Sequence, residues 1–189
     1  MKKIILLAVF AICSLFTKGQ IQTFDSLSFT TEKEAYVQLR GKTKGIYWGK
    51  IDSIYVKVYI GNNAVYGNYH LRGNFQINLP IDRKITLEIL RKGFYPKRIT
   101  VNTALPKQEA KPYFLIFDFF MIEKRSLKGL DDFVLDFPTG LVEYNKQKQN
   151  FVYAEKYTDK MFKEINKLLE EAEKRERKEK AQAKAEAKN

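Results

Sequence analysis

Hydrophobic and polar residues alternate through residues 73–103 in three short runs, and this pattern predicts three β-strands. The apolar positions of these runs are Phe75, Ile77, Leu79, Ile85, Leu87, Ile89, Ile99 and Val101. A period of two places the apolar residues on one face of each strand. Turns are predicted at residues 80–82 and 92–93, the second containing a glycine that adopts a positive φ without steric cost. We therefore expect an antiparallel meander that buries Leu87 and leaves Glu88 on the solvent side.

Further strand signals lie on both sides of the meander. Before it, strands are predicted at residues 36–40, 54–60 and 64–66. Loops are expected at residues 41–45 and around His70. After it, residues 113–122 are strongly apolar and predict a central strand buried on both faces. Asp118 interrupts this strand as either a catalytic carboxylate or a structural one, and the lack of a neighbouring histidine, nucleophile or second carboxylate favours the structural interpretation.

The last third of the chain predicts a β-hairpin followed by a helix. Residues 133–137 alternate weakly, and the hairpin arms are residues 141–144 and 150–153. Thr158 is expected to cap the N-terminus of the helix. One apolar stripe at helical spacing consists of Phe162, Ile165, Leu168, Leu169 and Ala172.

After Glu173 the helix has no large apolar side chain, so we expect its front half to dock and its back half to project as a charged rod or to fray. Three pairs at i, i+4 spacing are expected to support the rod. They are Glu171 with Arg175, Glu173 with Arg177, and Glu176 with Lys180. Because the rod has no stripe with which to pack, its removal is expected to leave the melting temperature nearly unchanged.

The N-terminus has the pattern of a secretory signal peptide. Two lysines precede an apolar run over residues 4–16. This run is shorter than the roughly 20 residues that a membrane-spanning helix needs. Thr17 and Gly19 are small residues at positions −3 and −1 of a cut before Gln20. We therefore expect export and a mature chain that starts at Gln20.

Two alternatives for the N-terminus are a retained anchor helix and lipidation of Cys13, the only cysteine. A lipoprotein signal needs a small residue before the cysteine, and Ile12 is not small. Cleavage before Gln20 leaves a mature chain without cysteine. Its stability then depends on burial, because no disulfide can form.

The charge of the chain indicates the chemistry of its partners. Lys and Arg number 34 against 22 Asp and Glu, for a formal net charge of +12. A basic balance favours anionic partners. For an exported chain these are membrane head groups, acidic glycans or an acidic protein face, and not nucleic acid. A solvated basic surface without a specific ligand is the alternative.

Candidate binding residues come from two segments. Tyr47 and Trp48 can form a stacking platform for a sugar or a peptide, or pack as ordinary core and rim residues. Arg175, Arg177 and Lys178 lie on the charged rod and are candidates for contacting another protein. A solvated tail without a role is the alternative for the rod.

No catalytic, cofactor or metal site is expected. His70 is the only histidine and has no second histidine or cysteine with which to bind zinc. No hydrolase, metalloprotease or nucleotide-binding motif occurs. One histidine and no mature cysteine remove most acid–base and nucleophile schemes, so we expect that the chain is not an enzyme.

Three segments resemble the carboxypeptidase regulatory-like domain. They are residues 54–60 (IYVKVYI), 73–80 (GNFQINLP) and 85–101 (ITLEILRKGFYPKRITV). The match covers about residues 36–123, and its most specific part is the K-G-F-Y-P-K segment. The resemblance implies a seven-stranded, transthyretin-like sandwich that packs against other domains or binds partners.

The segments after the meander are similar to a C-terminal extension in exported proteins of Gram-negative bacteria that use type IX secretion and gliding. They read YFLIFDFFMIEK, LDFPTGLVEYN and FVYAEKYTDKMFKEI. This similarity implies an accessory role in a secretion, gliding or outer-membrane assembly.

These observations predict a mainly β protein, a transthyretin-like seven-stranded antiparallel β-sandwich with a C-terminal α-helix. The expected division is a signal peptide at 1–19, an arm at 20–35, the sandwich at 36–123, a β-hairpin extension at 124–157 and the charged helix at 158–189. We expect a non-enzymatic interaction or scaffolding protein of the periplasm or outer membrane, with another envelope protein as its partner. The alternative is a binding module for an anionic glycan or lipid head group at a membrane surface.

Overall fold

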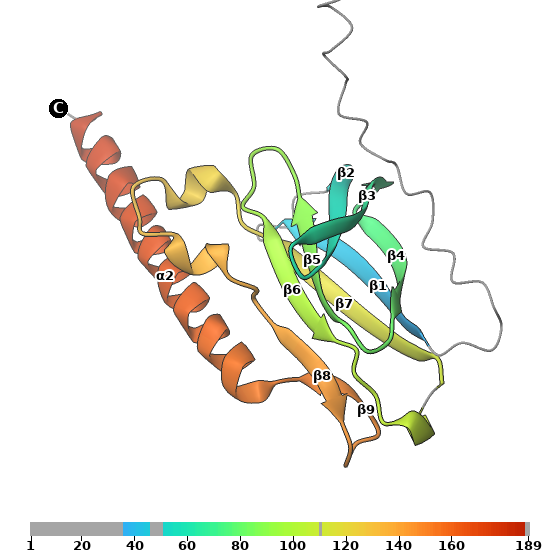
Figure 1. The fold of residues 1–189 in the computed structure, drawn as a ribbon. Helices are drawn as coiled ribbons and strands as arrows, with labels where there is room; N and C mark the ends of the chain where they lie inside the picture. Colours follow the sequence, from blue (N-terminus) through green and yellow to red (C-terminus); the bar gives the residue numbers. More distant parts are fainter. Residues whose placement is uncertain (1–35, 46–50, 110, 188–189) are drawn as a thin grey trace, which may run out of the picture.

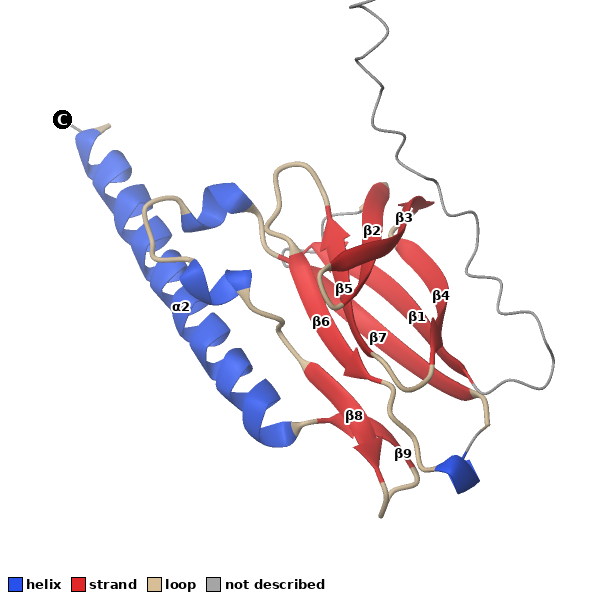
Figure 2. Cartoon of the chain, viewed as in Figure 1, coloured by secondary structure: helices blue, strands red, loops and turns tan. Residues whose placement is uncertain are grey.

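The computed structural model describes residues 36–45, 51–109 and 111–187. In these ranges the chain is mainly β, with nine strands in two sheets and one long C-terminal helix (Figures 1 and 2). The expected fold class is therefore confirmed. The number of strands differs from seven because the two arms of the hairpin join one of the sheets.

The smaller sheet has three strands in the order β4-β1-β7. Its members are β1 (Tyr36–Gly45), β4 (Asn74–Pro80) and β7 (Tyr113–Met121). Strand β1 is antiparallel to β4 and parallel to β7, so the sandwich is not purely antiparallel as predicted. The first strand thus continues through residues 41–45, where a loop was predicted, because both neighbours extend its ladder.

The larger sheet has six strands in the order β3-β2-β5-β6-β8-β9. Its members are β2 (Ser53–Ile60), β3 (Asn63–Leu71), β5 (Lys84–Leu90), β6 (Lys97–Asn102), β8 (Leu141–Asn145) and β9 (Asn150–Tyr153). Only β6 and β8 are parallel neighbours here. The hairpin at β8 and β9 is confirmed, whereas residues 133–136 form a 3₁₀ helix instead of a weak strand.

The predicted meander is divided between the two sheets. Strands β5 and β6 pair as expected, but β4 pairs with β1 and not with β5. The change of sheet occurs at residues 80–84, where the Thr103 side chain is fully buried. Its hydroxyl donates a hydrogen bond to the Pro80 carbonyl oxygen (2.7 Å) and accepts one from the Arg83 N–H (3.0 Å). These bonds satisfy the backbone at the corner, so the chain can leave one sheet for the other.

The two sheets enclose one hydrophobic core. Leu39, Leu79 and Leu87 are fully buried, and the cluster continues through the inward residues of strands from both sheets. In β2 and β4, buried residues alternate with less buried ones, as a period of two requires when only one face is covered. Leu87 therefore points inward as predicted. Glu88 does not extend freely into solvent, since its carboxylate binds Arg98 at 2.8 Å and accepts a hydrogen bond from the Tyr59 hydroxyl (3.1 Å).

Strand β7 is not buried on both faces, which corrects the prediction made from its apolar sequence. Phe119 and Met121 point into the core. On the other side Phe114, Ile116 and Phe120 are 57%, 78% and 44% exposed. The reason is that neither the helix nor another sheet covers the outer side of the three-stranded sheet in the described part of the chain (Figure 1).

Helix α2 (Glu155–Glu186) begins one turn before Thr158, which corrects the predicted cap. Ala154 precedes the first helical residue, and Thr158 is buried inside the helix. Phe162 is 47% exposed, and Met161 takes its place in the stripe. The buried positions Met161, Ile165, Leu168 and Ala172 are spaced by four, three and four residues, so they share one face.

The helix docks mainly on two short 3₁₀ helices, not on a sheet face. These are η3 (Lys124–Leu127) and η4 (Phe133–Asp136), which lie between α2 and the sheets in Figure 1. A second apolar cluster joins the three elements through Ile122, Leu127, Leu135, Ile165, Leu168 and Ala172. The front half of the helix therefore docks as expected, on a surface that the sequence pattern did not indicate. No helix of the described residues is both long and apolar enough to cross a membrane.

Lys97 is expected to make the stability of the fold rise with pH. Burial lowers the pKa of this lysine to about 8, from 10.5 for an exposed one. Between these values the unfolded chain binds more protons than the folded one, so the free energy of unfolding increases as the pH rises. From pH 7.5 to 9.5 we expect a gain on the order of 1–2 kcal/mol in urea melts, relative to the variant Lys97→Met. Parallel pH profiles for the two proteins would contradict this.

Candidate binding site

A groove lies beside strand β2 on the outer side of the six-stranded sheet. Tyr55 and Lys57 occupy the outward positions of β2, because Ile54, Val56 and Val58 point into the core. Tyr69 of β3 is directly opposite Tyr55 in the ladder. Cross-strand neighbours on one face are close enough to interact, and the centroids of the two tyrosine rings are 4.7 Å apart. The Lys57 ammonium lies 6.0 Å from the Tyr55 ring centroid.

The opposite wall of the groove is the turn between β5 and β6. The Arg91 guanidinium is placed over the Phe94 ring, 5.2 Å from its centroid. An isolated bridge joins Phe94 to Glu123, and the Lys124 N–H donates to the Gly93 carbonyl oxygen at 2.9 Å. These backbone contacts bring Lys124 to the groove from a distant part of the sequence.

We call this hollow of about 710 Å³ the β2 groove. Its lining includes Tyr55, Lys57, Tyr69, Arg91, Lys92 and Lys124. Four of the lining residues are basic and one, Asp52, is acidic. The ion pairs found among the described residues all lie elsewhere. The β2 groove therefore carries a concentrated positive charge that Asp52 offsets only in part.

Arg91 has a hydrogen-bond donor without a partner in the described part of the chain. One amino group of its guanidinium, Nη1, is buried and has no hydrogen-bond acceptor among the described residues. A buried donor without a partner is costly, and such a group in a native structure needs an explanation, such as a bound water or ion. Arg91 is thus the residue of the β2 groove with the clearest unused binding capacity.

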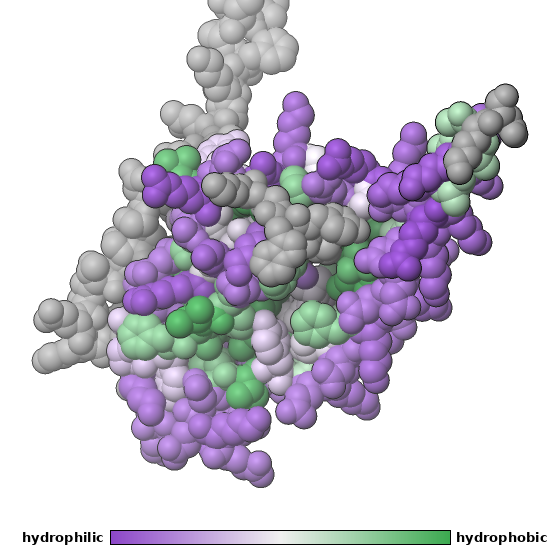
Figure 3. All heavy atoms as spheres, turned by 180° about the vertical axis from the view of Figure 1, so that it is seen from behind, coloured by the Kyte–Doolittle hydropathy of each residue, from purple (hydrophilic) through white to green (hydrophobic). Residues whose placement is uncertain are grey.

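A second exposed surface is the outer side of the three-stranded sheet, which we call the outer face. It comprises Phe114, Ile116 and Phe120 of β7 and Arg40, Lys42 and Lys44 of β1. The parallel register places Arg40 beside Ile116 and Lys44 beside Phe120. In the view from behind, apolar atoms gather in a patch between hydrophilic ones (Figure 3).

Contacts across the outer face join its two rows. The Arg40 guanidinium is 5.8 Å from the Phe114 ring centroid, and the Lys44 ammonium is 5.9 Å from that of Phe120. Lys44 also lies 3.4 Å from a carboxylate oxygen of Asp118, whose side chain is 52% exposed. Asp118 is therefore a surface residue with a cation beside it, and not the buried carboxylate that the sequence suggested.

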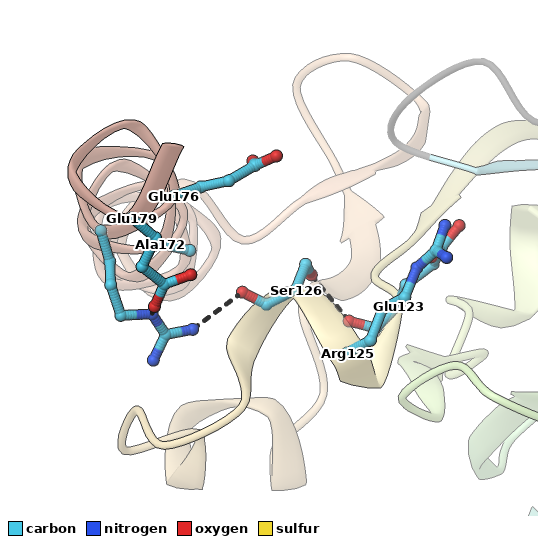
Figure 4. Close-up of a pocket in the computed structure, with 7 residues that line it drawn as sticks. Glu123, Arg125, Ser126, Ala172, Glu176 and Glu179 are labelled. Atoms are coloured by element: carbon cyan, nitrogen blue, oxygen red, sulfur yellow. Dashed lines mark hydrogen bonds and ion pairs between the residues drawn. The ribbon is translucent and has the colours of Figure 1, made fainter. Parts of the chain in front are cut away.

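A second hollow, of about 360 Å³, lies between helix α2 and η3 (Figure 4). Arg175 reaches across it and donates hydrogen bonds to the carbonyl oxygens of Lys128 and Ser126. Glu123 and Glu176 are among its lining residues. The first turns after Glu173 are thus attached to the body of the protein, which corrects the expectation that the helix projects freely from this point.

The predicted binding residues of the rod have different surroundings. Arg175 is engaged with η3 and pairs with Glu179 at 3.7 Å, not with Glu171. Arg177 pairs with Glu173 at 3.6 Å, as expected. The pair of Glu176 and Lys180 also forms as expected. Lys178 is exposed on the helix.

The other predicted binding residues, Tyr47 and Trp48, lie outside the described residues. His70 lies on β3 and not in a loop. It shares a hydrogen bond of 3.0 Å with the Tyr66 hydroxyl, and burial lowers its pKa. Within the described ranges, no group of three or more His, Cys, Asp or Glu side chains is arranged to hold a metal ion.

Sequence reasoning did not single out the residues of the β2 groove. Tyr55 and Lys57 were recognisable as the polar side of a predicted strand, and that alternation was the available signal. Arg91 and Lys124 are 33 residues apart in the numbering, and only tertiary contacts, such as the bridge between Phe94 and Glu123, bring their segments together.

No protein-family model matches this chain, and no curated protein matches it. Solved structures do match. One is the 3-chlorocatechol 1,2-dioxygenase of Rhodococcus opacus 1CP, with a TM-score of 0.35 and 7% identity over 48% of this chain and 61% of that chain. Another is the chlorocatechol 1,2-dioxygenase of Pseudomonas putida, with a TM-score of 0.36 and 9% identity over 50% of this chain and 63% of that chain.

A third is the hydroxyquinol 1,2-dioxygenase of Pseudomonas putida DLL-E4, with a TM-score of 0.35 and 10% identity over 62% of this chain and 71% of that chain. The chain spans less than two thirds of the length of the first two structures. These matched proteins are enzymes, a finding that contradicts our expectation that the chain is not an enzyme, and we withdraw that expectation. Likeness at this level assigns no reaction, substrate or cofactor to the chain.

Proposed function

We propose that this chain is an exported cell-envelope protein of the carboxypeptidase regulatory-like type that binds another envelope protein through its outer face. It would act as an interaction or scaffolding component of a secretion, gliding or outer-membrane assembly. The observation that carries the proposal is the row of exposed apolar side chains Phe114, Ile116 and Phe120 on one strand. The signal-peptide pattern of residues 1–19 supports export.

The composition of the outer face is that of an interaction surface. Scattered apolar side chains are ordinary on protein surfaces, but contiguous apolar patches with a polar border mark interaction sites. Aromatic residues and arginine are enriched at interfaces, and here Phe114 has Arg40 beside it. Lys42 and Lys44 continue the basic row, so a complementary partner would combine apolar and acidic residues.

The outer face can be tested by photo-crosslinking in the native envelope. A crosslinking amino acid at position 116 is expected to capture a defined envelope protein, identified by mass spectrometry. The matched control is position 71, because Ile116 and Leu71 are 78% and 77% exposed but lie on different sheets. The same spectra report whether the recovered chain starts at Gln20, as export predicts, or at an acylated Cys13.

Introduction of a negative charge gives the second arm of this test. Ile116→Glu is expected to reduce the crosslinked product from a probe at position 114 at least tenfold, while Leu71→Glu leaves it unchanged. Both changes are on the surface, so both proteins should keep the melting temperature of the parent. Equal capture at positions 116 and 71, or capture only of the chain's own residues 20–35, would contradict the proposal.

A further inference from the structure

We propose that the β2 groove binds an acidic saccharide, with the anionic group of the ligand at Arg91 and Lys124 and a sugar ring against Tyr69. This site is separate from the outer face, and neither proposal depends on the other. The proposal assigns a location and residues to the alternative function expected from the sequence, a binding module for an anionic glycan.

The positive charge of the β2 groove selects for an anion. Lys57, Arg91, Lys92 and Lys124 line one hollow that includes a single carboxylate. Elsewhere on the described surface, cations such as Arg98 and Arg177 have acidic partners, at 2.8 Å and 3.6 Å. Four like charges that converge beside a single carboxylate repel one another, so an anionic ligand would reduce that repulsion.

Arg91 supplies the geometry for a carboxylate, sulfate or phosphate group. A guanidinium presents several N–H donors in a planar fork that matches the oxygens of these anions. The fork is oriented by its position over Phe94, at 5.2 Å, and its Nη1 amino group has no acceptor in the described chain. Because the Arg91 guanidinium is already oriented, it loses little further conformational freedom when it binds a ligand.

The aromatic residues favour a saccharide as the body of the ligand. The rings of Tyr55 and Tyr69 support each other at 4.7 Å, and Tyr69 is 72% exposed. An exposed ring that is fixed by its neighbour offers a flat apolar surface beside polar groups, which fits the apolar face of a sugar ring. The hollow of about 710 Å³ lies within the range of about 300–1,000 Å³ typical of small-ligand sites.

The same lining disfavours a lipid as the ligand. Its aliphatic members are Ile54, Leu90 and Pro96. Three such side chains along an open basic hollow do not enclose an acyl chain. A lipid head group at a membrane therefore has fewer contacts with the β2 groove than a free acidic saccharide has. Binding of vesicles without binding of the saccharide would contradict the proposal.

Isothermal titration of the mature full-length chain tests the site. The probes are trigalacturonic acid, the neutral trisaccharide maltotriose, inorganic phosphate, and vesicles that contain phosphatidylglycerol. We expect saturable binding of trigalacturonic acid that weakens as salt increases, because the pairing is ionic. Maltotriose and inorganic phosphate are expected to bind at least tenfold more weakly.

Variants assign the binding to the β2 groove. Lys124→Ala and Tyr69→Ala are expected to weaken trigalacturonic acid binding about tenfold each, and Arg91→Gln by more. The matched control is Lys163→Ala, which removes an exposed lysine on helix α2. Lys124 and Tyr69 keep the test valid if Arg91→Gln fails to fold, since Tyr69 is largely exposed and Lys124 is a surface residue.

Three outcomes would overturn the proposal. They are equal binding of maltotriose, binding of vesicles without binding of the trisaccharide, and equal weakening by Lys163→Ala. If the two sites are separate, Tyr69→Ala does not change crosslinking from position 116. The proposal for the β2 groove can therefore fail while the proposal for the outer face still holds, and the reverse.

Discussion

Replacing Leu87 by alanine is expected to lower the free energy of unfolding by about 2–5 kcal/mol, the range for large-to-small changes in a protein core. Leu87 is fully buried, and its strand β5 lies in the middle of the six-stranded sheet, between β2 and β6. Leu39 and Leu79 from the other sheet belong to the same cluster. The substitution removes a side chain that the two sheets share, and β-strands on both sides restrict collapse of the cavity.

Urea unfolding of the parent and of Leu87→Ala measures the effect. The matched control is Gln76→Ala on β4, an exposed position that should change the free energy of unfolding by less than about 0.5 kcal/mol. A loss below about 1 kcal/mol for Leu87→Ala would show that the site collapses or that the facing of β5 is wrong.

Glu88 is not the neutral control that its place in the sequence suggests. Its side chain is 12% exposed, and Arg98 and Tyr59 both bind its carboxylate, at 2.8 Å and 3.1 Å. Glu88→Ala removes charge-assisted hydrogen bonds and leaves Arg98 without that partner, so we expect a loss of about 1.5–3 kcal/mol. The sequence places Glu88 on the correct side of the strand, but alternation alone does not reveal what lies there.

The strands were predictable because each one buries a single face, and burial on one face produces a period of two. Their division between sheets was not predictable in the same way. Residues 75–79 and 85–89 have the same pattern, yet they lie in different sheets. The difference depends on the corner at residues 80–84 and on Thr103, whose hydroxyl closes that corner from the far end of β6. A local pattern contains no information about a contact between segments so far apart.

Strand β7 and helix α2 show two further limits. In β7 the outward residues are as apolar as the inward ones, so the sequence has no alternation from which to recognise an exposed face. In α2 the helical spacing was correct, but Met161 and Phe162 are both apolar and adjacent, and only tertiary packing decides which one is buried. The two binding surfaces could not be predicted from the sequence, because each combines residues from segments that are far apart in the chain.

Gly41→Ala is expected to destabilise the fold by about 1–3 kcal/mol through overpacking. Gly41 lies on β1 in the centre of the three-stranded sheet, opposite Phe75 of β4 and beside Phe117 of β7. A Cβ atom at this position would overlap the Phe75 ring and lie 2.9 Å from the Phe119 ring. These two rings are stacked, with centroids 5.7 Å apart, and both are buried. The added methyl group must therefore displace Phe75 from the stack or move the backbone of β1.

A double-mutant cycle identifies the cause of that loss. Phe75→Leu removes part of the ring and is itself expected to destabilise the fold, because it reduces burial in the core. If the methyl group clashes with Phe75, the double variant Gly41→Ala/Phe75→Leu should lose less stability than the sum of the two single changes, by at least about 0.5 kcal/mol. Lys42→Ala, on the outward side of the same strand, is the control and should be nearly neutral. Additive losses would show that the cost of Gly41→Ala does not come from its contact with Phe75, and would place it in the backbone of β1 or against Phe119.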